Sequence, residues 1–179
     1  MKLPIFFTNF YFLFLLTSFL NLFAQPHVVE FNQKLDTSAL TDLIKSEWTK
    51  LFPTPYYDQS IVSAMLINKR PGDITHSTKQ LTIKVLHEDQ KIVGFITYYF
   101  INNIILHIEL LAIHSNFRAK GYGKFLINWV INEAKNQGAK AAELYVYNTN
   151  PKAIEFYKCL GFTPKYTFPG YKLLSKDIT

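Results

Sequence analysis

Leu110–Gly123 reads LLAIHSNFRAKGYG, and the fold of this chain can be worked out from this stretch. Its first residues are apolar and have the composition of a strand, whereas its end, RAKGYG at 118–123, is a polar glycine turn. Glycine lets the backbone approach a ligand closely, and the unpaired N–H groups of a helix's first turn bind anions. The stretch therefore predicts a strand, a turn and a helix that together bind an anionic ligand.

The helix after the turn is predicted over Gly121–Asn136, with Gly138 ending it. Apolar side chains recur on one face at helical spacing, namely Tyr122, Phe125, Leu126, Trp129, Val130 and Ala134. The apolar run Ile104–Ile113 before the turn is long enough for a central strand.

Two helices are expected early in the chain. One starts at Thr37 or Ser38 behind an Asp36 cap, and the other runs from an Asp58 cap to Asn68. A last helix begins at the Asn150-Pro151 pair and ends at Gly161.

Strands are expected wherever residues alternate in polarity or form short apolar runs. They fall at 28–31, 81–85, 92–100, 104–113, 142–147, 162–168 and 171–174, and Gly94 is expected to mark a bulge. Because neither an internal repeat nor a linker interrupts this pattern, residues 25–179 are predicted to form one α/β domain.

Residues 1–24 differ from the rest of the chain. Lys2 is the only charged residue, Ile5–Phe23 is rich in Phe and Leu, and Ala24 precedes a polar break. This pattern is typical of a secretory signal peptide cleaved after Ala24. An uncleaved membrane anchor is the alternative, since about 20 apolar residues can span a bilayer. Either reading predicts export, to the periplasm or medium; if the segment is not a working signal, the protein is cytoplasmic.

The composition excludes several classes of function. Lys and Arg number 19 against 13 Asp and Glu, a net charge of +6, but no five basic residues are consecutive, so nucleic acid is not an expected partner. The single cysteine, Cys159, excludes an internal disulfide, and no Cys/His cluster has metal-ligand spacing. A mildly basic surface suits an anionic ligand.

Two motifs in the right order resemble the GCN5-related N-acetyltransferase (GNAT) family. The family pattern Arg/Gln-x-x-Gly-x-Gly/Ala is matched by Arg118-x-x-Gly121-x-Gly123, after an apolar strand end. Downstream, residues 150–162 read NPKAIEFYKCLGF, with Asn150, an alanine three residues later, Tyr157 and a closing Gly-Phe, as family members commonly have.

The resemblance implies a fold and a co-substrate. The fold is a mixed, mostly antiparallel sheet of about six to seven strands with about four flanking helices, splayed between the strands at 104–113 and 141–147. The co-substrate is acetyl-CoA, without a metal. Its pyrophosphate would bind at the turn, its pantetheine arm along the central strand, and Asn150 would hold the cofactor or nearby backbone. The turn residues are Arg118, Lys120, Gly121, Tyr122, Gly123 and Lys124, and the strand residues are Leu111, Ala112 and Ile113.

The same resemblance implies an amine acceptor, either a small molecule or a protein, and a monomer or homodimer. Tyr157 occupies the position of the family's usual general acid. Glu109 is the preferred general base, because burying an unpaired carboxylate in so apolar a strand is costly and a catalytic role would explain its presence. The alternatives are His107, Glu143, Tyr145 and a water molecule. A non-catalytic acyl-CoA-binding module with a degenerate acceptor site is the competing function.

Overall fold

The computed structural model describes residues 25–52, 54–67 and 81–179. The expected signal segment 1–24 and the expected helix end at Asn68 lie outside the described residues. The elements are β1 (His27–Glu30), α2 (Gln33–Leu51), α3 (Gln59–Leu66), β2 (Thr82–Glu88), β3 (Lys91–Ile101), β4 (Ile105–Ile113), the 3₁₀ turn η1 (Ser115–Phe117), α4 (Tyr122–Asn136), β5 (Ala141–Tyr147), α5 (Pro151–Cys159), β6 (Thr163–Phe168) and β7 (Tyr171–Asp177).

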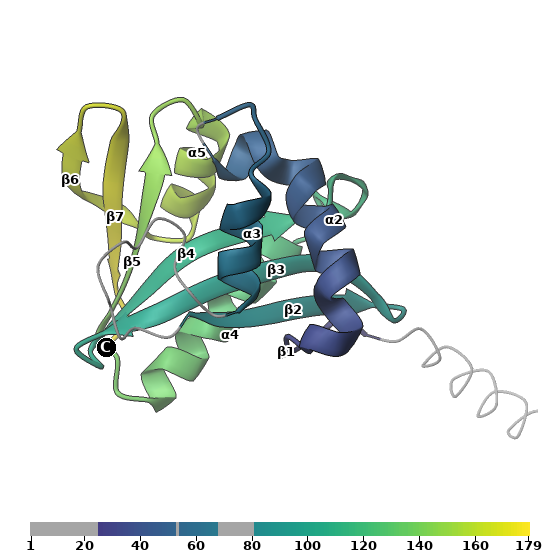
Figure 1. Cartoon of the computed structure of the whole chain (residues 1–179). Coiled ribbons are helices and arrows are strands. Elements are labelled where there is room, and N and C mark those ends of the chain that lie inside the picture. The colour runs from purple at the N-terminus through teal and green to yellow at the C-terminus, as the bar shows by residue number, and fades with distance from the viewer. Residues whose placement is uncertain (1–24, 53, 68–80) are drawn as a thin grey trace, which may run out of the picture.

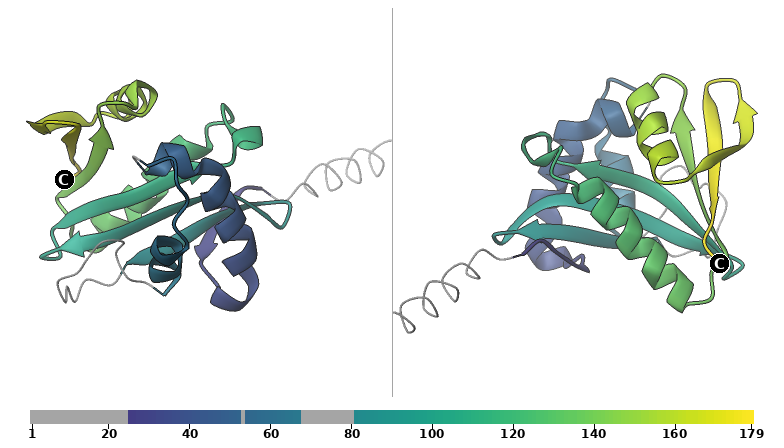
Figure 2. Two further views of the ribbon diagram at one scale, coloured as in Figure 1. Left: turned by 45° about the horizontal axis from the view of Figure 1, so that its top comes forward. Right: turned by 180° about the vertical axis from the view of Figure 1, so that it is seen from behind.

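The strands form a seven-stranded sheet in the order β1-β2-β3-β4-β5-β7-β6. All neighbours are antiparallel except β4 and β5, which are parallel. Helices α2 and α3 cover one face of the sheet, and α4 and α5 lie on the other (Figures 1 and 2). The predicted mixed, mostly antiparallel sheet with flanking helices is confirmed.

Each face of the sheet carries its own apolar core. On one face, Leu40, Ile44 and Trp48 of α2 pack with the fully buried Phe95 of β3. On the other face, Leu126 and Val130 from the stripe predicted for α4 are completely buried, whereas Phe125 of that stripe is exposed and the unpredicted Ile127 and Ile131 are buried. The central strands are thus covered on both sides, which explains why β4 reads as a nearly continuous apolar run.

The first helix begins earlier than its sequence predicts. Asn32 caps α2 by accepting hydrogen bonds from the N–H groups of Lys34 (3.0 Å) and Leu35 (3.3 Å). Asp36 is not the cap but lies in the first turn, where its Oδ2 accepts the N–H of Asn32 at 2.7 Å. The predicted start at Thr37 or Ser38 is therefore wrong. Asn32 and Asp36 are both residues that favour the N-cap position, and the hydrogen bonds that they make to each other's turn place Asn32 at the cap and Asp36 inside the helix. The predicted Asp58 cap of α3 is confirmed.

Strands β4 and β5 diverge partway along their length, as predicted. Their pairing covers only Ile105–Ile108 of β4 against Ala141–Leu144 of β5. Glu109, the next residue of β4, is the extra residue of a β-bulge: Tyr98 of β3 pairs with Ile108, whereas Thr97 pairs with Leu110. Among the described strands, none pairs with the second half of β4 on that side, so its backbone can accept an added strand.

A second bulge lies in β3 beside Gly94, where Leu86 pairs with Gly94 and His87 with Ile92. A Cβ atom on Gly94 would lie 2.5 Å from Cδ1 of Ile113, at the end of β4. The carbonyl oxygen of Ala112 would lie 3.0 Å away, so glycine favours the close packing of β3 on β4 beside the turn. The predicted bulge is confirmed. Over the described ranges, no helix is both long and apolar enough to cross a bilayer.

Candidate active site

The two glycines of the turn are needed for different reasons. Gly121 has φ +82°, a left-handed conformation that glycine adopts without strain, and it caps the start of α4. Gly123 has an ordinary φ, but a Cβ there would lie 3.1 Å from Cζ of Phe156. Gly121 therefore shapes the turn, and Gly123 lets α4 approach α5 closely.

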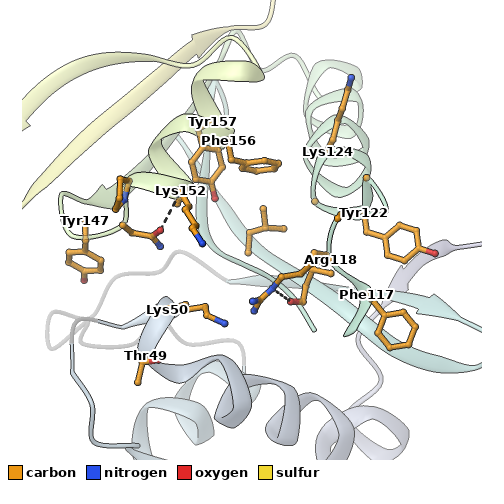
Figure 3. A pocket seen from close by; sticks show the side chains of 18 of the residues that line it. Thr49, Lys50, Phe117, Arg118, Tyr122, Lys124, Tyr147, Lys152, Phe156 and Tyr157 are labelled. Atoms are coloured by element: carbon orange, nitrogen blue, oxygen red, sulfur yellow. Dashed lines mark hydrogen bonds between the residues drawn. The ribbon is translucent and has the colours of Figure 1, made fainter. Parts of the chain in front are cut away.

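A cavity of about 840 Å³ opens between this turn, the end of β4, the start of α5 and the last turn of α2 (Figure 3). It is called the turn pocket below. Most of the cofactor residues predicted from sequence line it: Leu111, Ile113, Arg118, Gly121, Tyr122, Gly123, Lys124 and Asn150. Two do not, because Ala112 is buried toward α2 and the ammonium of Lys120 lies 3.5 Å from the Glu88 carboxylate.

Several residues of the turn pocket were missed by the sequence analysis. Lys50 and Thr49 come from the end of α2, and Lys152 comes from the first turn of α5. Lys152 belongs to the motif at residues 150–162, and its position in the first turn of a predicted helix could have indicated an anion-binding role. Nothing local marked Lys50, because only the packing of α2 over β4 brings it to the site. With Arg118 and Lys124, these lysines make the pocket basic, which suits phosphate.

Arg118 is held by the protein on two sides. Its Nε donates to the carbonyl oxygen of Ile113 at 3.1 Å, and its Nη2 donates to the carboxylate of Glu47 in α2. Glu47 is 2 % exposed. The guanidinium is therefore fixed in the wall of the pocket rather than extended freely into solvent.

A second cavity, of about 490 Å³, adjoins the first. Residues common to both include Lys50, Phe52, Leu111, Tyr147, Asn150 and Tyr157. The second cavity, called the sheet pocket below, is reached by His107, Glu109, Tyr145 and Tyr171 from the diverging strands. The two pockets thus meet at Leu111 and Tyr157.

Tyr157 occupies the junction of the pockets. Its side chain hangs from α5, is 9 % exposed and points its hydroxyl into the space above β4 (Figure 3). Burial raises the pKa of Tyr157 well above the ordinary value for a phenol. The phenol therefore keeps its proton at neutral pH, as a proton donor must.

The structure places the candidate general bases in two different environments. Glu109 and His107 line the sheet pocket side by side, with Oε2 of Glu109 3.8 Å from Nε2 of His107. Burial, and secondarily the charge of Glu109, raises the pKa of Tyr147. Glu143 is instead bonded to the ammonium of Lys165 at 2.6 Å and to Ser175 Oγ at 3.4 Å, and it is not among the described residues that line either pocket.

Asn150 has a structural task in addition to its place in both pockets. Its Oδ1 accepts the N–H of Ala153 at 3.1 Å, so it caps α5, and Pro151 occupies the first helical position. The predicted cap is confirmed. Within the ranges that the structure describes, no three His, Cys, Asp or Glu side chains are arranged to hold a metal ion.

Two sequence comparisons show which known proteins this chain is similar to. The model of the Acetyltransferase (GNAT) family matches residues 37–162. An uncharacterised N-acetyltransferase of Methanocaldococcus jannaschii is 38 % identical over 94 residues, which are 49 % of this chain and 42 % of that protein. The matched segment is thus less than half of the relative's length.

Solved structures show the same fold. The PaiA N-acetyltransferase of Thermoplasma acidophilum, in complex with coenzyme A, has a TM-score of 0.67 at 19 % identity, covering 86 % of this chain and 99 % of that one. Ard1 of Thermoplasma volcanium has a TM-score of 0.65 at 22 % identity, covering 86 % and 98 %. With the family model covering most of the described chain, the resemblance drawn from the two motifs is confirmed: this chain belongs to the acetyltransferase (GNAT) family.

Proposed function

We propose that this protein transfers an acetyl group from acetyl-CoA to an amine. One observation carries the proposal: two pockets meet at Leu111 and Tyr157, with a glycine turn in one and Glu109 in the other. A thioester lying in the turn pocket would present its carbonyl carbon to an amine that enters from the sheet pocket. The family membership and the coenzyme A complex of the Thermoplasma acidophilum relative support this arrangement.

The turn pocket fits the parts of acetyl-CoA. The N–H groups at the start of α4 would bind the pyrophosphate, and the helix dipole adds about half a positive charge there. Lys124 and Lys152 supply further positive charge at the pocket wall. The edge of β4 from Leu110 to Ile113, beyond its pairing with β5, would pair with the amide groups of the pantetheine arm. When bound, the cofactor supplies an activated acetyl group.

Two side chains divide the proton transfers. Glu109 would take a proton from the acceptor ammonium, directly or through a water molecule, so that the amine can attack. A backbone N–H near Leu111 would stabilise the charge that develops on the carbonyl oxygen. Tyr157 would then donate its phenolic proton to the departing sulfur, and the proton that the nitrogen loses as the amide forms would restore the phenol. The raised pKa of Tyr157 keeps that proton available over the neutral range.

Export by residues 1–24 is proposed on the sequence pattern alone. The acceptor is then an amine that the domain meets outside the cytosol, or in another compartment that contains acetyl-CoA. A small molecule and a protein are both compatible with the sheet pocket, which is open and aromatic.

The deciding experiment measures CoA binding by calorimetry and thiol release with a panel of amines. Wild-type protein is expected to bind CoA and to release thiol with at least one amine, whereas Tyr157→Phe is expected to bind CoA normally and turn over slowly. CoA binding without turnover on any amine would favour a non-catalytic acyl-CoA-binding module. Failure of the wild-type protein to bind CoA would exclude both functions.

A further inference from the structure

Glu47 is a carboxylate buried on the helix that faces the turn pocket. Only 2 % of the residue is exposed, and two cations contact it. Nη2 of Arg118 donates to Oε2 of Glu47, and the ammonium of Lys50 lies 3.1 Å from the same oxygen. Both cations line the turn pocket, and Lys50 also lines the sheet pocket.

Burying the carboxylate of Glu47 costs free energy unless its two cationic partners compensate its charge. A buried carboxylate without compensating cations is strongly unfavourable, and a contact with one exposed lysine contributes little. Here the second partner, Arg118, is also bonded to the carbonyl oxygen of Ile113 at 3.1 Å. Arg118 is therefore clamped between α2 and the end of β4, and its remaining N–H groups are left for the pocket.

The same carboxylate orients Lys50. In Figure 3 the ammonium of Lys50 and the guanidinium of Arg118 lie close together on the α2 side of the cavity. Two like charges held together at a pocket wall repel each other, and Glu47 between them reduces that repulsion. An anion entering the pocket would meet both cations already in place, without the entropic cost of ordering two long side chains.

We infer that Glu47 is a positioning residue for the cofactor: it fixes Arg118 and Lys50 at the turn pocket and makes α2 part of the site for the CoA phosphates. This inference rests on the proposed function. It assigns a role to α2, which lies more than sixty positions upstream of the glycine turn in the sequence.

The test is a double-mutant cycle on CoA affinity, measured by calorimetry. Glu47→Gln keeps the size of the side chain and removes its charge, and it is expected to weaken CoA binding about tenfold, through loss of a charge-assisted contact. Arg118→Gln is expected to weaken it by a similar factor. If Glu47 acts through its two cations, its loss costs less once Arg118 has been replaced: the double variant is expected to bind CoA more weakly than Arg118→Gln, but by clearly less than the factor lost in Glu47→Gln alone.

Two further variants separate positioning from general stability. Glu143→Gln removes an equally buried carboxylate, 5 % exposed, from its contact with Lys165, and CoA affinity is expected to stay within twofold. Glu47→Asp retains the charge and is expected to lie between the wild-type protein and Glu47→Gln; it keeps the test usable if Glu47→Gln does not fold.

The outcomes distinguish the inference from the proposed function. Wild-type protein that does not bind CoA would overturn both. Two results would overturn the inference alone, provided that the wild-type protein binds CoA. In the first, Glu47→Gln binds CoA as well as the wild-type protein does; in the second, the losses of affinity in the two single variants multiply in the double variant. A loss in Glu143→Gln as large as that in Glu47→Gln would also overturn it, because burial rather than position would then be the cause.

Discussion

Oε2 of Glu109 lies 3.8 Å from Nε2 of His107, on the side of β4 that lines the sheet pocket. His107 is 3 % exposed and lies between the rings of Tyr99 and Tyr145, with centroids 4.9 Å and 5.3 Å away. The imidazole is thus buried against two tilted aromatic rings, whereas the side chain of Glu109 is 21 % exposed. This arrangement favours Glu109 as the group that meets the amine and gives His107 a supporting position.

Glu109→Gln is accordingly expected to lower kcat/KM by about a hundredfold or more, because loss of a general base costs this much. His107→Gln is expected to lower it less. Rates of thiol release across pH would separate the two, since only the variant that has lost the base should lose the acidic limb of the profile. A larger loss in His107→Gln than in Glu109→Gln would reverse the assignment.

Tyr157→Phe is expected to reduce kcat by about a hundredfold or more while leaving the Kd for CoA within twofold, because the ring remains and only the proton donor is lost. The control is Tyr166→Phe, which removes the hydroxyl of a tyrosine that is 57 % exposed on β6. Steady-state thiol release would show the difference. Unchanged kcat in Tyr157→Phe would exclude the tyrosine as the acid.

Gly121→Ala and Gly138→Ala form a matched pair. Both glycines have positive φ, +82° and +86°, and a Cβ added at either would lie more than 4 Å from heavy atoms other than those of its chain neighbours. Each substitution is expected to lower the free energy of unfolding by about 1–2 kcal/mol, the cost of a side chain in the left-handed region. Only Gly121→Ala should also weaken CoA binding, because the strain falls on the turn. Equal CoA affinities in the two variants would contradict this role.

Alkaline pH is expected to destabilise the fold through buried tyrosine. Burial, with help from the charges of Glu30 and Glu133, raises the pKa of Tyr98 to about 12. Between the unfolded pKa of about 10 and this value, the unfolded chain loses the proton and the folded protein keeps it. The contribution of Tyr98 to the free energy of unfolding should therefore be constant below about pH 10 and fall by about 1.4 kcal/mol per pH unit between about pH 10 and 12.

Denaturant titrations of wild-type protein and Tyr98→Phe between pH 9 and 12 would measure this contribution to the slope. Tyr98→Phe should lose this contribution to the pH dependence of the free energy of unfolding, whereas Tyr166→Phe should retain it. A wild-type stability that rises above pH 10 would refute the assignment.

The mature protein is expected to begin at Gln25 after secretion, because the apolar run ends at Ala24 ahead of a polar break. N-terminal sequencing of protein from the culture medium or the periplasm would show this directly. Intact Met1 in a soluble cytosolic fraction would contradict export, and intact Met1 in the membrane fraction would establish the anchor.

The sequence by itself determined the local features of this protein. The glycine turn, the helix stripe at Tyr122–Ala134 and the Asn150 cap are each specified within a few residues, by backbone freedom, periodicity and hydrogen bonding. These features were sufficient to predict the family, a mixed, mostly antiparallel sheet of about six to seven strands, and the wall of the turn pocket that the glycine turn forms. The start of α2 was missed because Asn32 and Asp36 are both good caps, and local preference does not choose between them.

Only the tertiary structure decided which distant groups meet. The packing of α2 over β4 brings Glu47 and Lys50 to the glycine turn, and the register of β7 and β6 turns Glu143 toward Lys165 and away from the pockets. The bulge at Glu109 and the divergence of β4 from β5 depend on pairing between strands. Such contacts depend on side chains far apart in the chain, so no local pattern in the sequence records them.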